Sequence, residues 1–187
     1  MTEPYPWPYD GQLVPARLAM LVIAGPPVPG RPQQLDAIAD LAQIVCAAGG
    51  LVIEVLTSEP RPSRTGAVGL ALSGTAEEVT GVAPAASVTS AGWDGFYGSP
   101  LDTVLRRLGR DQLLMTGWWL ETGVHSTLRS ANDMGYECLT LVDCCLPLDD
   151  STAKGAVSSI QMSGGIFGAT GTSADVLSLL PILESSR

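Results

Sequence analysis

The chain offers few side chains for acid–base or nucleophilic chemistry. Among its 187 residues, His125 is the only histidine and Lys154 the only lysine. A Ser–His or Cys–His catalytic pair could therefore use only His125, and a catalytic lysine could only be Lys154. The four cysteines form no CxxC pair, and one histidine cannot build a zinc site of two or three His. We expect no metal and no cofactor.

The segment that invites a catalytic residue runs from position 116 to 145, TGWWLETGVHSTLRSANDMGYECLTLVDCC. An apolar run ends at Met115, Glu121 and Thr122 suit a helix start, and Gly135 ends the helix before a second apolar run. The pattern predicts strand, turn, helix and strand. Such a turn at the carboxyl edge of a parallel sheet often holds a nucleophile, but the corresponding position here is Gly123.

The remaining elements must position this turn. Apolar runs and helical spacing predict strands at 18–24, 51–56, 87–89, 112–115 and 165–169, and helices at 33–48, from 99 onward, at 151–163 and at 173–180. In the helix after Ser99-Pro100, the expected buried face is Val104, Leu105 and Leu108. The β-α alternation predicts one three-layer α/β/α domain, residues 17–187, with a doubly wound, mostly parallel, Rossmann-like sheet. Residues 1–16, rich in proline and aromatics, are expected as an extended arm lying on the core or on a neighbouring subunit.

Charge and composition narrow the possible partners. The net charge of −9 repels phosphate backbones, so we expect no nucleic-acid partner. No apolar run reaches the roughly 18 residues of a membrane span, and the acidic, Pro-rich start has no signal-peptide pattern. The expected location is the cytoplasm, with the cysteines as thiols and no membrane contact.

Several segments together resemble one family. The segment from Gly117 to Tyr136 resembles the active-site segment of the isochorismatase-like cysteine hydrolases, which include isochorismatase, nicotinamidase, N-carbamoylsarcosine amidase and biuret hydrolase. GFYGSPLDTVLR, from Gly95, resembles the family's Phe-x-Gly-Thr-x-Leu segment. PYPWPYDG…LAMLVIA resembles the biuret- and ureidoacrylate-hydrolase branch, whereas residues 58–88 look shortened and unmatched. The residues that match the active-site pattern are Thr127, Arg129, Ala131, Asp133, Gly135 and Tyr136.

The resemblance implies three catalytic positions, and this chain departs from the family at each. The family uses an Asp after the first strand as proton acceptor, a Lys before the Phe-x-Gly segment, and a Cys at the helix start as nucleophile. These positions are Ala24, Ser90 and Gly123. The resemblance therefore implies that hydrolysis by the family route is lost.

Other residues could substitute, and each has a structural alternative. Asp94 and Glu121 flank the expected pocket and are candidate bases, or ordinary loop carboxylates. Cys144 and Cys145 are expected to follow the fifth strand as packing residues. His125 lies about 200° around the helix from Gly123 and is expected at an interface or in solvent.

The expected ligand contacts are Trp118, Trp119, Thr122, Gly123 and Phe96. The resemblance implies that the turn can carry a non-proline cis peptide, and the tryptophans could either line a pocket or fill core.

All three replacements, at positions 24, 90 and 123, make the side chain smaller than the family's residue. We therefore expect a pocket repurposed for a non-hydrolytic reaction in a specialised biosynthetic pathway. The alternatives are a non-catalytic subunit of an active partner enzyme, and a small-molecule-binding protein. The expected partners are a small-molecule ligand and either a homo-oligomer or a hetero-oligomer with a related subunit.

Overall fold

A six-stranded sheet forms the centre of the protein, and every recorded strand pair in it is parallel. The computed structural model describes residues 13–25, 33–58 and 79–180. The strand order is β3-β2-β1-β4-β5-β6. The strands are β1 (Leu18–Ala24), β2 (Leu51–Leu56), β3 (Ala86–Thr89), β4 (Gln112–Trp118), β5 (Glu137–Leu146) and β6 (Ala169–Gly171).

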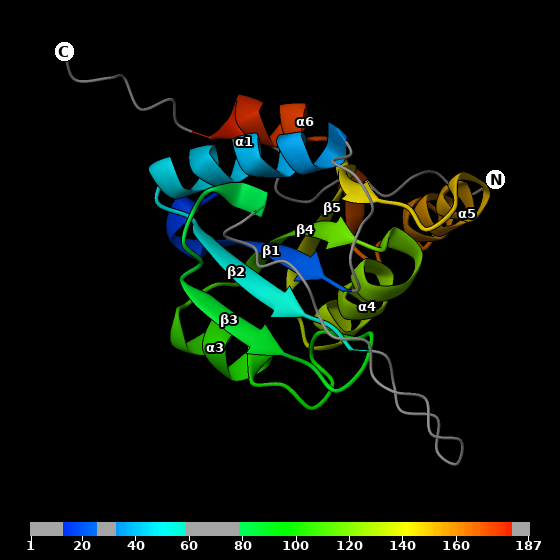
Figure 1. Ribbon diagram of the computed structural model, residues 1–187, viewed down its shortest axis with the longest axis horizontal. Coiled ribbons are helices and arrows are strands. Elements are labelled where there is room, and N and C mark those ends of the chain that lie inside the picture. The colour runs from blue at the N-terminus through cyan, green and yellow to red at the C-terminus, as the bar shows by residue number, and fades with distance from the viewer. Residues whose placement is uncertain (1–12, 26–32, 59–78, 181–187) are drawn as a thin grey trace.

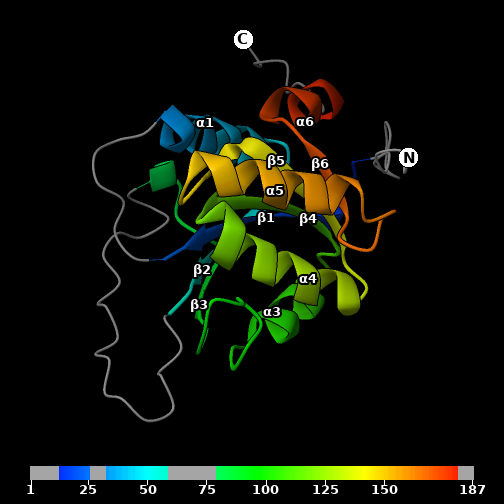
Figure 2. The ribbon, with the colours of Figure 1, turned by 90° about the vertical axis from the view of Figure 1, so that its right-hand side faces the viewer.

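Helices cover both faces of the sheet (Figures 1 and 2). The helices α1 and α6 lie on one face, and α3, α4 and α5 lie on the other. They are α1 (Gln33–Ala47), α3 (Leu101–Arg107), α4 (His125–Asp133), α5 (Asp150–Gln161) and α6 (Ser173–Leu179), with a 3₁₀ turn η1 (Pro15–Arg17) and a π-helical turn η2 (Leu120–Val124).

The sequence of β1 explains the three layers. All seven of its residues are buried. Because side chains alternate along a strand, Met20 and Val22 face the core under α1 and α6, whereas Leu21 and Ile23 face the core under α3 and α4. A strand buried on both faces needs an unbroken apolar run, which LAMLVIA provides. The expected α/β/α class is thus confirmed, with a sheet that is parallel throughout the described part.

Three strand predictions need correction. The strand predicted at 165–169 is instead β6, because Gly164, Gly165 and Gly168 all have positive φ and form a turn there. The strand predicted at 112–115 continues to Trp118. Likewise, β5 extends to Leu146, so Cys144 and Cys145 lie within this strand and do not follow it.

Two helix predictions also differ from the structure. The expected buried face of α3 holds for Leu105, which is fully buried, but Leu108 follows the helix and is 38% exposed. This helix begins at Leu101, one residue later than Ser99-Pro100 predicts. The helix expected from Glu121 begins as the π-helical turn η2 and becomes α-helical at His125.

Most of the predicted N-terminal arm, residues 1–12, lies outside the described residues. From position 13 the chain is attached to the domain. Leu13 is buried, and η1 leads directly into β1. The Val14 amide donates a hydrogen bond to the Gln112 side chain at 2.9 Å.

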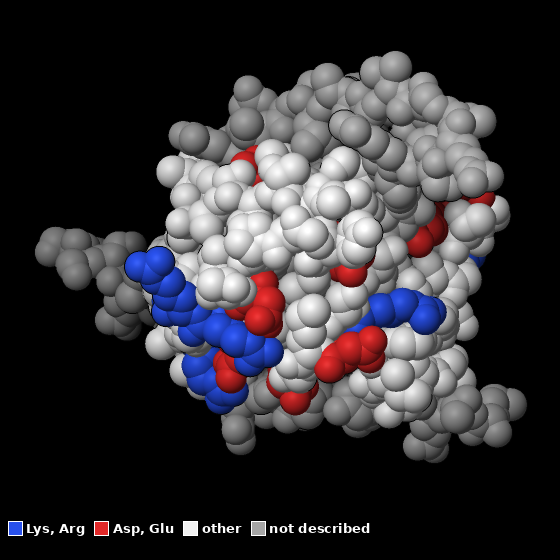
Figure 3. Space-filling model, turned by 90° about the horizontal axis from the view of Figure 1, so that it is seen from below, with Lys and Arg blue, Asp and Glu red and all other residues white. Residues whose placement is uncertain are grey.

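The surface charges are mixed where Figure 3 shows them. Basic side chains lie beside acidic ones on this face and do not gather in one continuous patch. On α3, Arg106 forms an ion pair with Asp102 at 2.8 Å. Among the described helices, none is both long and apolar enough to cross a membrane.

Candidate active site

The strand order reverses between β1 and β4, and sheets of this type open a crevice at the point of reversal. The chain winds outward from β1 to β2 and β3 on one side, and from β4 to β5 and β6 on the other. In such sheets, ligands bind beyond the carboxyl ends of the strands at the point where the order reverses. Ala24 and Trp118 end the two strands at this point.

The three positions of interest meet around the end of β2. The backbone amide and hydroxyl of Thr57 both donate to the Ala24 carbonyl, at 2.7 and 3.0 Å. A Cβ atom placed on Gly123 would lie 3.6 Å from the same hydroxyl oxygen. The Ser90 amide donates to the carbonyl of Leu56, the residue before Thr57, at 2.9 Å. The structure therefore brings Ala24, Ser90 and Gly123 to one place.

The polar side chains at this place are neutral and already bonded. The hydroxyl of Ser90 is buried and donates to the Gly92 carbonyl at 2.6 Å. The Thr57 hydroxyl is committed to Ala24, as described above. Neither Ala24 nor Gly123 supplies a polar side chain. This cluster of four residues contains no ionisable side chain.

Gly123 lies in the turn η2, which is closely surrounded. A Cβ at this position would meet the Ile23 side chain at 3.3 Å and the Trp118 carbonyl at 3.4 Å. The peptide bond between Trp118 and Trp119 is cis. The amides of Thr122 and Val124, on either side of Gly123, both donate to the Trp119 carbonyl.

Thr122 has a buried hydroxyl oxygen without a hydrogen-bond partner in the described part of the chain. Leaving such a group unpaired costs about 1–3 kcal/mol. It directly precedes Gly123, so it is a candidate polar contact for a ligand at this turn.

Asp94 is held by two neighbours. One carboxylate oxygen accepts the Phe96 amide at 2.9 Å, and the other accepts the Ser130 hydroxyl at 2.6 Å. These bonds join the loop after β3 to α4. Asp94 therefore holds the loop after β3 against α4.

Glu121 is also engaged, at the other side of η2. Its carboxylate accepts the amides of Leu148 and Asp149 at 2.9 and 3.3 Å, and the Thr152 hydroxyl at 3.1 Å. These groups lie at the start of α5, where a negative charge is favoured by the helix dipole. The bonds join η2 to this helix.

The aromatic residues expected around a ligand divide between the two faces of the sheet. Trp118 is buried in the core under α1 and α6, and Trp119 packs against the same core. Phe96 lies in the core under α3 and α4, with its ring 5.8 Å from that of Tyr136. The structure therefore brings Trp118 and Trp119 together and places Phe96 apart from them.

Cys144 and Cys145 are buried in β5. Burial raises the pKa of the Cys144 thiol to about 12, with a further contribution from Asp143. Burial also raises the pKa of Cys145 well above its usual value. Thiols that stay protonated at neutral pH are poor nucleophiles, so both contacts and chemistry agree with a packing role.

His125 belongs to a cluster with the segment before β6. Its Nδ1 accepts a hydrogen bond from Arg129 at 3.3 Å, and the Arg129 guanidinium stacks over the Phe167 ring at 3.9 Å. Its Nε2 is buried without a partner among the described residues. Burial lowers the pKa of His125, and the charge of Arg129 lowers it further.

This lowered pKa predicts a pH-dependent stability. Between the ordinary His pKa of about 6.5 and the lower folded value, the unfolded chain binds more protons than the folded chain. The free energy of unfolding should therefore fall as the pH drops below about 6.5. Thermal unfolding from neutral to mildly acidic pH should show a shallower decline for His125→Gln. Equal slopes for both proteins would contradict this assignment.

Sequence reasoning missed two residues of this site. Thr57 connects Ala24 to Gly123, and Trp93 lies 3.8 Å from where a Cβ on Gly25 would stand. Thr57 directly follows a buried strand that ends at the same sheet edge as β1, which was a usable signal. Trp93 is in an irregular loop, and its position could not be deduced from spacing. The described residues contain no cluster of three or more His, Cys, Asp or Glu that could hold a metal ion.

Comparison with known proteins identifies the family of this chain. The isochorismatase domain matches residues 21–174. An uncharacterised isochorismatase family protein, YwoC of Bacillus subtilis (strain 168), is 36% identical over 64 residues, which are 34% of each chain. A second, YecD of Escherichia coli O157:H7, is 38% identical over 53 residues, or 28% of each chain. The matched segments thus span about a third or less of these curated relatives.

Solved structures share the fold over most of their length. A cysteine hydrolase from Pseudomonas syringae pv. phaseolicola 1448A has a TM-score of 0.77 and 21% identity, covering 95% of this chain and 96% of that one. The nicotinamidase SaPncA from Staphylococcus aureus has a TM-score of 0.65 and 17% identity, covering 84% of this chain and 99% of that one. The domain match extends over most of the sheet and all of the candidate site, and the chain belongs to the isochorismatase family.

Proposed function

We propose that this chain is a non-hydrolytic member of its family. In this proposal, the site around Gly123 receives a small uncharged molecule for a reaction without a protein nucleophile, such as a cyclisation, isomerisation or elimination in a specialised biosynthetic pathway. The observation that carries the proposal is the meeting of Ala24, Ser90 and Gly123 in one uncharged place. The family route, as the resemblance implies it, needs a carboxylate, a cation and a thiol there.

The neutral groups of the site support this choice of ligand. A charged ligand would lose its hydration without gaining an opposite charge from this cluster, which is costly in a buried place. The Gly123 amide and the unpartnered Thr122 hydroxyl can instead bond a carbonyl or hydroxyl group. Catalysis would then depend on orientation and on polarisation of that group by the amide.

A second candidate function has its own support. The hydroxyls of Thr57 and Ser90 already have backbone partners, so they do not require a ligand. This is what a non-catalytic subunit of a larger enzyme would show, with the fold retained for assembly. Such a subunit would be the partner of a related active chain.

Gly123→Ala should separate the two functions. The added methyl group would stand 3.3 to 3.6 Å from its neighbours, which requires shifts of a few tenths of an ångström, so the protein should fold with nearly unchanged melting temperature. If the site handles a molecule, cells carrying this variant should show the same change in metabolite profile as cells lacking the protein.

The matched control is Gly155→Ala. Gly155 lies in α5 with open space around its Cβ position, so this change should stabilise the helix and leave the metabolite profile unaltered. If Gly123→Ala cells instead match the wild type while the deletion differs, the site has no chemical role, and the subunit function is the better one.

A further inference from the structure

A cavity lies over the end of β5 and is bordered by Leu120 of η2, the turn that also holds Gly123. Its volume is about 530 Å³, within the range of sites that hold small molecules. It exists because β6 pairs only with residues 139–141 of β5, whereas β5 continues to Leu146. The strand β6 cannot continue further, because Thr172 caps α6 directly after it. The end of β5 therefore faces α5 across an open space.

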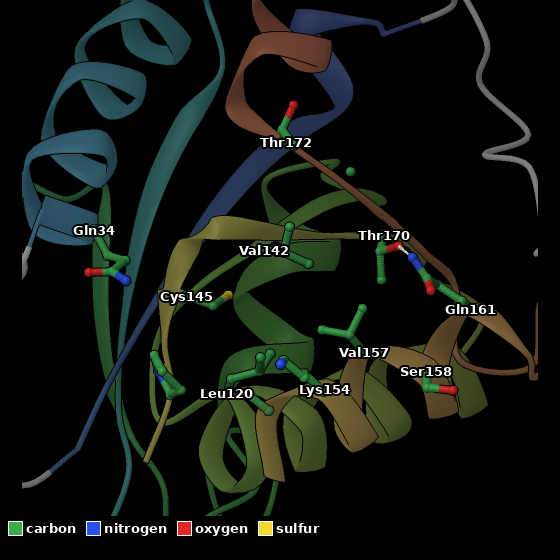
Figure 4. A pocket seen from close by; sticks show the side chains of 13 residues that line it. Gln34, Leu120, Val142, Cys145, Lys154, Val157, Ser158, Gln161, Thr170 and Thr172 are labelled. Carbon is green, nitrogen blue, oxygen red and sulfur yellow. Dashed lines mark hydrogen bonds between the residues drawn. The ribbon is translucent and has the colours of Figure 1, made fainter. Parts of the chain in front are cut away.

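The walls of this cavity divide into an apolar middle and polar ends. In Figure 4, Val142 and Cys145 of β5 and Val157 of α5 enclose the middle. Gln34 stands at one end, from α1. At another end of the cavity, the Gln161 side chain donates a hydrogen bond to the Thr170 hydroxyl at 3.0 Å.

Lys154 is the only lysine of the chain, and its side chain reaches this cavity from α5 (Figure 4). It makes no ion pair within the part of the chain that the structure describes. The other ionisable lining group there, the Cys145 thiol, is kept neutral because burial raises its pKa. The lining thus presents one positive charge.

The carboxylates of Asp143 and Asp175 do not line the cavity and are bound to other groups. Asp143 accepts the amide and hydroxyl of Ser173, and Asp175 accepts the amide and hydroxyl of Thr172. Glu121 is held at the start of α5, as described above. Their charges still repel anions, so the single ammonium group suits a ligand with one negative charge and not two.

We propose that this cavity is a binding site for a small monocarboxylate with an apolar body. The carboxylate would lie against the Lys154 ammonium, and the body would cover Val142, Cys145 and Val157. This site goes beyond the proposed function, because its lining includes Leu120 of η2 but none of the four residues of the candidate active site, Ala24, Thr57, Ser90 and Gly123.

The test uses 3-phenylpropanoate and its neutral counterpart, 3-phenylpropanamide, as probes at millimolar concentration. Titrations of the full chain followed by NMR should show tighter binding of the carboxylate by roughly three- to tenfold, a modest preference because Lys154 is exposed and its charge is screened by solvent. The shifted signals should be those of Val142, Val157 and Leu120. Added salt should weaken binding of the carboxylate more than that of the amide.

Charge variants test the role of Lys154. Lys154→Met should reduce the affinity for the carboxylate to that for the amide, and Lys154→Arg should retain the preference. The matched control is Arg107→Met, which removes the same charge from an exposed position on α3 and should change neither affinity. Gly123→Ala should also leave binding unchanged, which keeps this test separate from that of the proposed function.

Three results would overturn the proposal. The first is binding of neither probe, and the second is equal or tighter binding of the amide. The third is an effect of Lys154→Met no larger than that of Arg107→Met.

Discussion

Gly123→Cys should leave the hydrolysis of nicotinamide, biuret, ureidoacrylate and isochorismate at background, as it is expected to be in the unmodified protein. The introduced thiol would stand beside the Ile23 side chain and the Trp118 carbonyl, with Thr57 as its nearest hydroxyl. None of these groups can accept its proton at neutral pH. A thiol without a base or a nearby cation stays protonated and unreactive.

The native cysteines illustrate how burial in this fold raises the pKa of a thiol. Cys144 has its pKa raised to about 12 chiefly by burial, in a strand two places from β1 in the sheet. The start of a helix would lower the pKa of the introduced thiol, but Ala24 and Ser90 would supply no acid–base partner and no cation. The measurement is product formation from each of the four substrates by Gly123→Cys and by the unmodified protein. Thiol-dependent product from Gly123→Cys would show that other residues can complete the family mechanism.

The sequence predicted the outline of the fold because local patterns determine it. The run LAMLVIA has the composition and length of a buried strand, and a strand buried on both faces requires helices on both sides of the sheet. The alternation of such runs with helical spacing then predicts a parallel sheet. The strand end at Ala24 and the turn at Gly123 follow from the same patterns.

The prediction of β6 was wrong for a reason that local patterns do not reveal. Ile166 and Phe167 resemble part of a buried strand, but Ile166 is 65% exposed, and the Phe167 ring is covered by the Arg129 guanidinium. The partner for this aromatic ring comes from α4, distant in the sequence. An apolar pair in a glycine-rich segment therefore formed a turn and not a strand.

The contacts of the candidate site could be predicted only in part. Parallel pairing of β1 with β2 brings Thr57 to Ala24, and that pairing became certain only with the sheet order. The engagement of Asp94 and Glu121 depends on Ser130 and on the start of α5, neither of which is close in sequence. From residue type alone, Asp94 and Glu121 were candidate bases. Their hydrogen bonds instead hold neighbouring parts of the fold together.

Gly117→Ala should have the largest effect on stability among the substitutions considered, with a loss of at least about 3 kcal/mol in the free energy of unfolding. Gly117 has φ of +112°, which L side chains rarely adopt, and lies where the register between β4 and β5 shifts. A Cβ there would stand 2.0 Å from the Ile23 carbonyl oxygen, within the backbone of β1. Relief of this overlap would require separation of β1 and β4 at the crevice.

Urea unfolding followed by tryptophan fluorescence can measure this loss, with Gly135→Ala as the matched control. Gly135 also has positive φ, at +86°, but its Cβ position has no neighbour within 4 Å. The control should therefore lose only the cost of the left-handed conformation, about 1–2 kcal/mol. The excess loss in Gly117→Ala then reports the steric overlap with Ile23. Should Gly117→Ala be too unstable to purify while Gly135→Ala folds, the same conclusion follows from their soluble yields. Equal losses in the two variants would mean that β1 and β4 are not this close at the crevice.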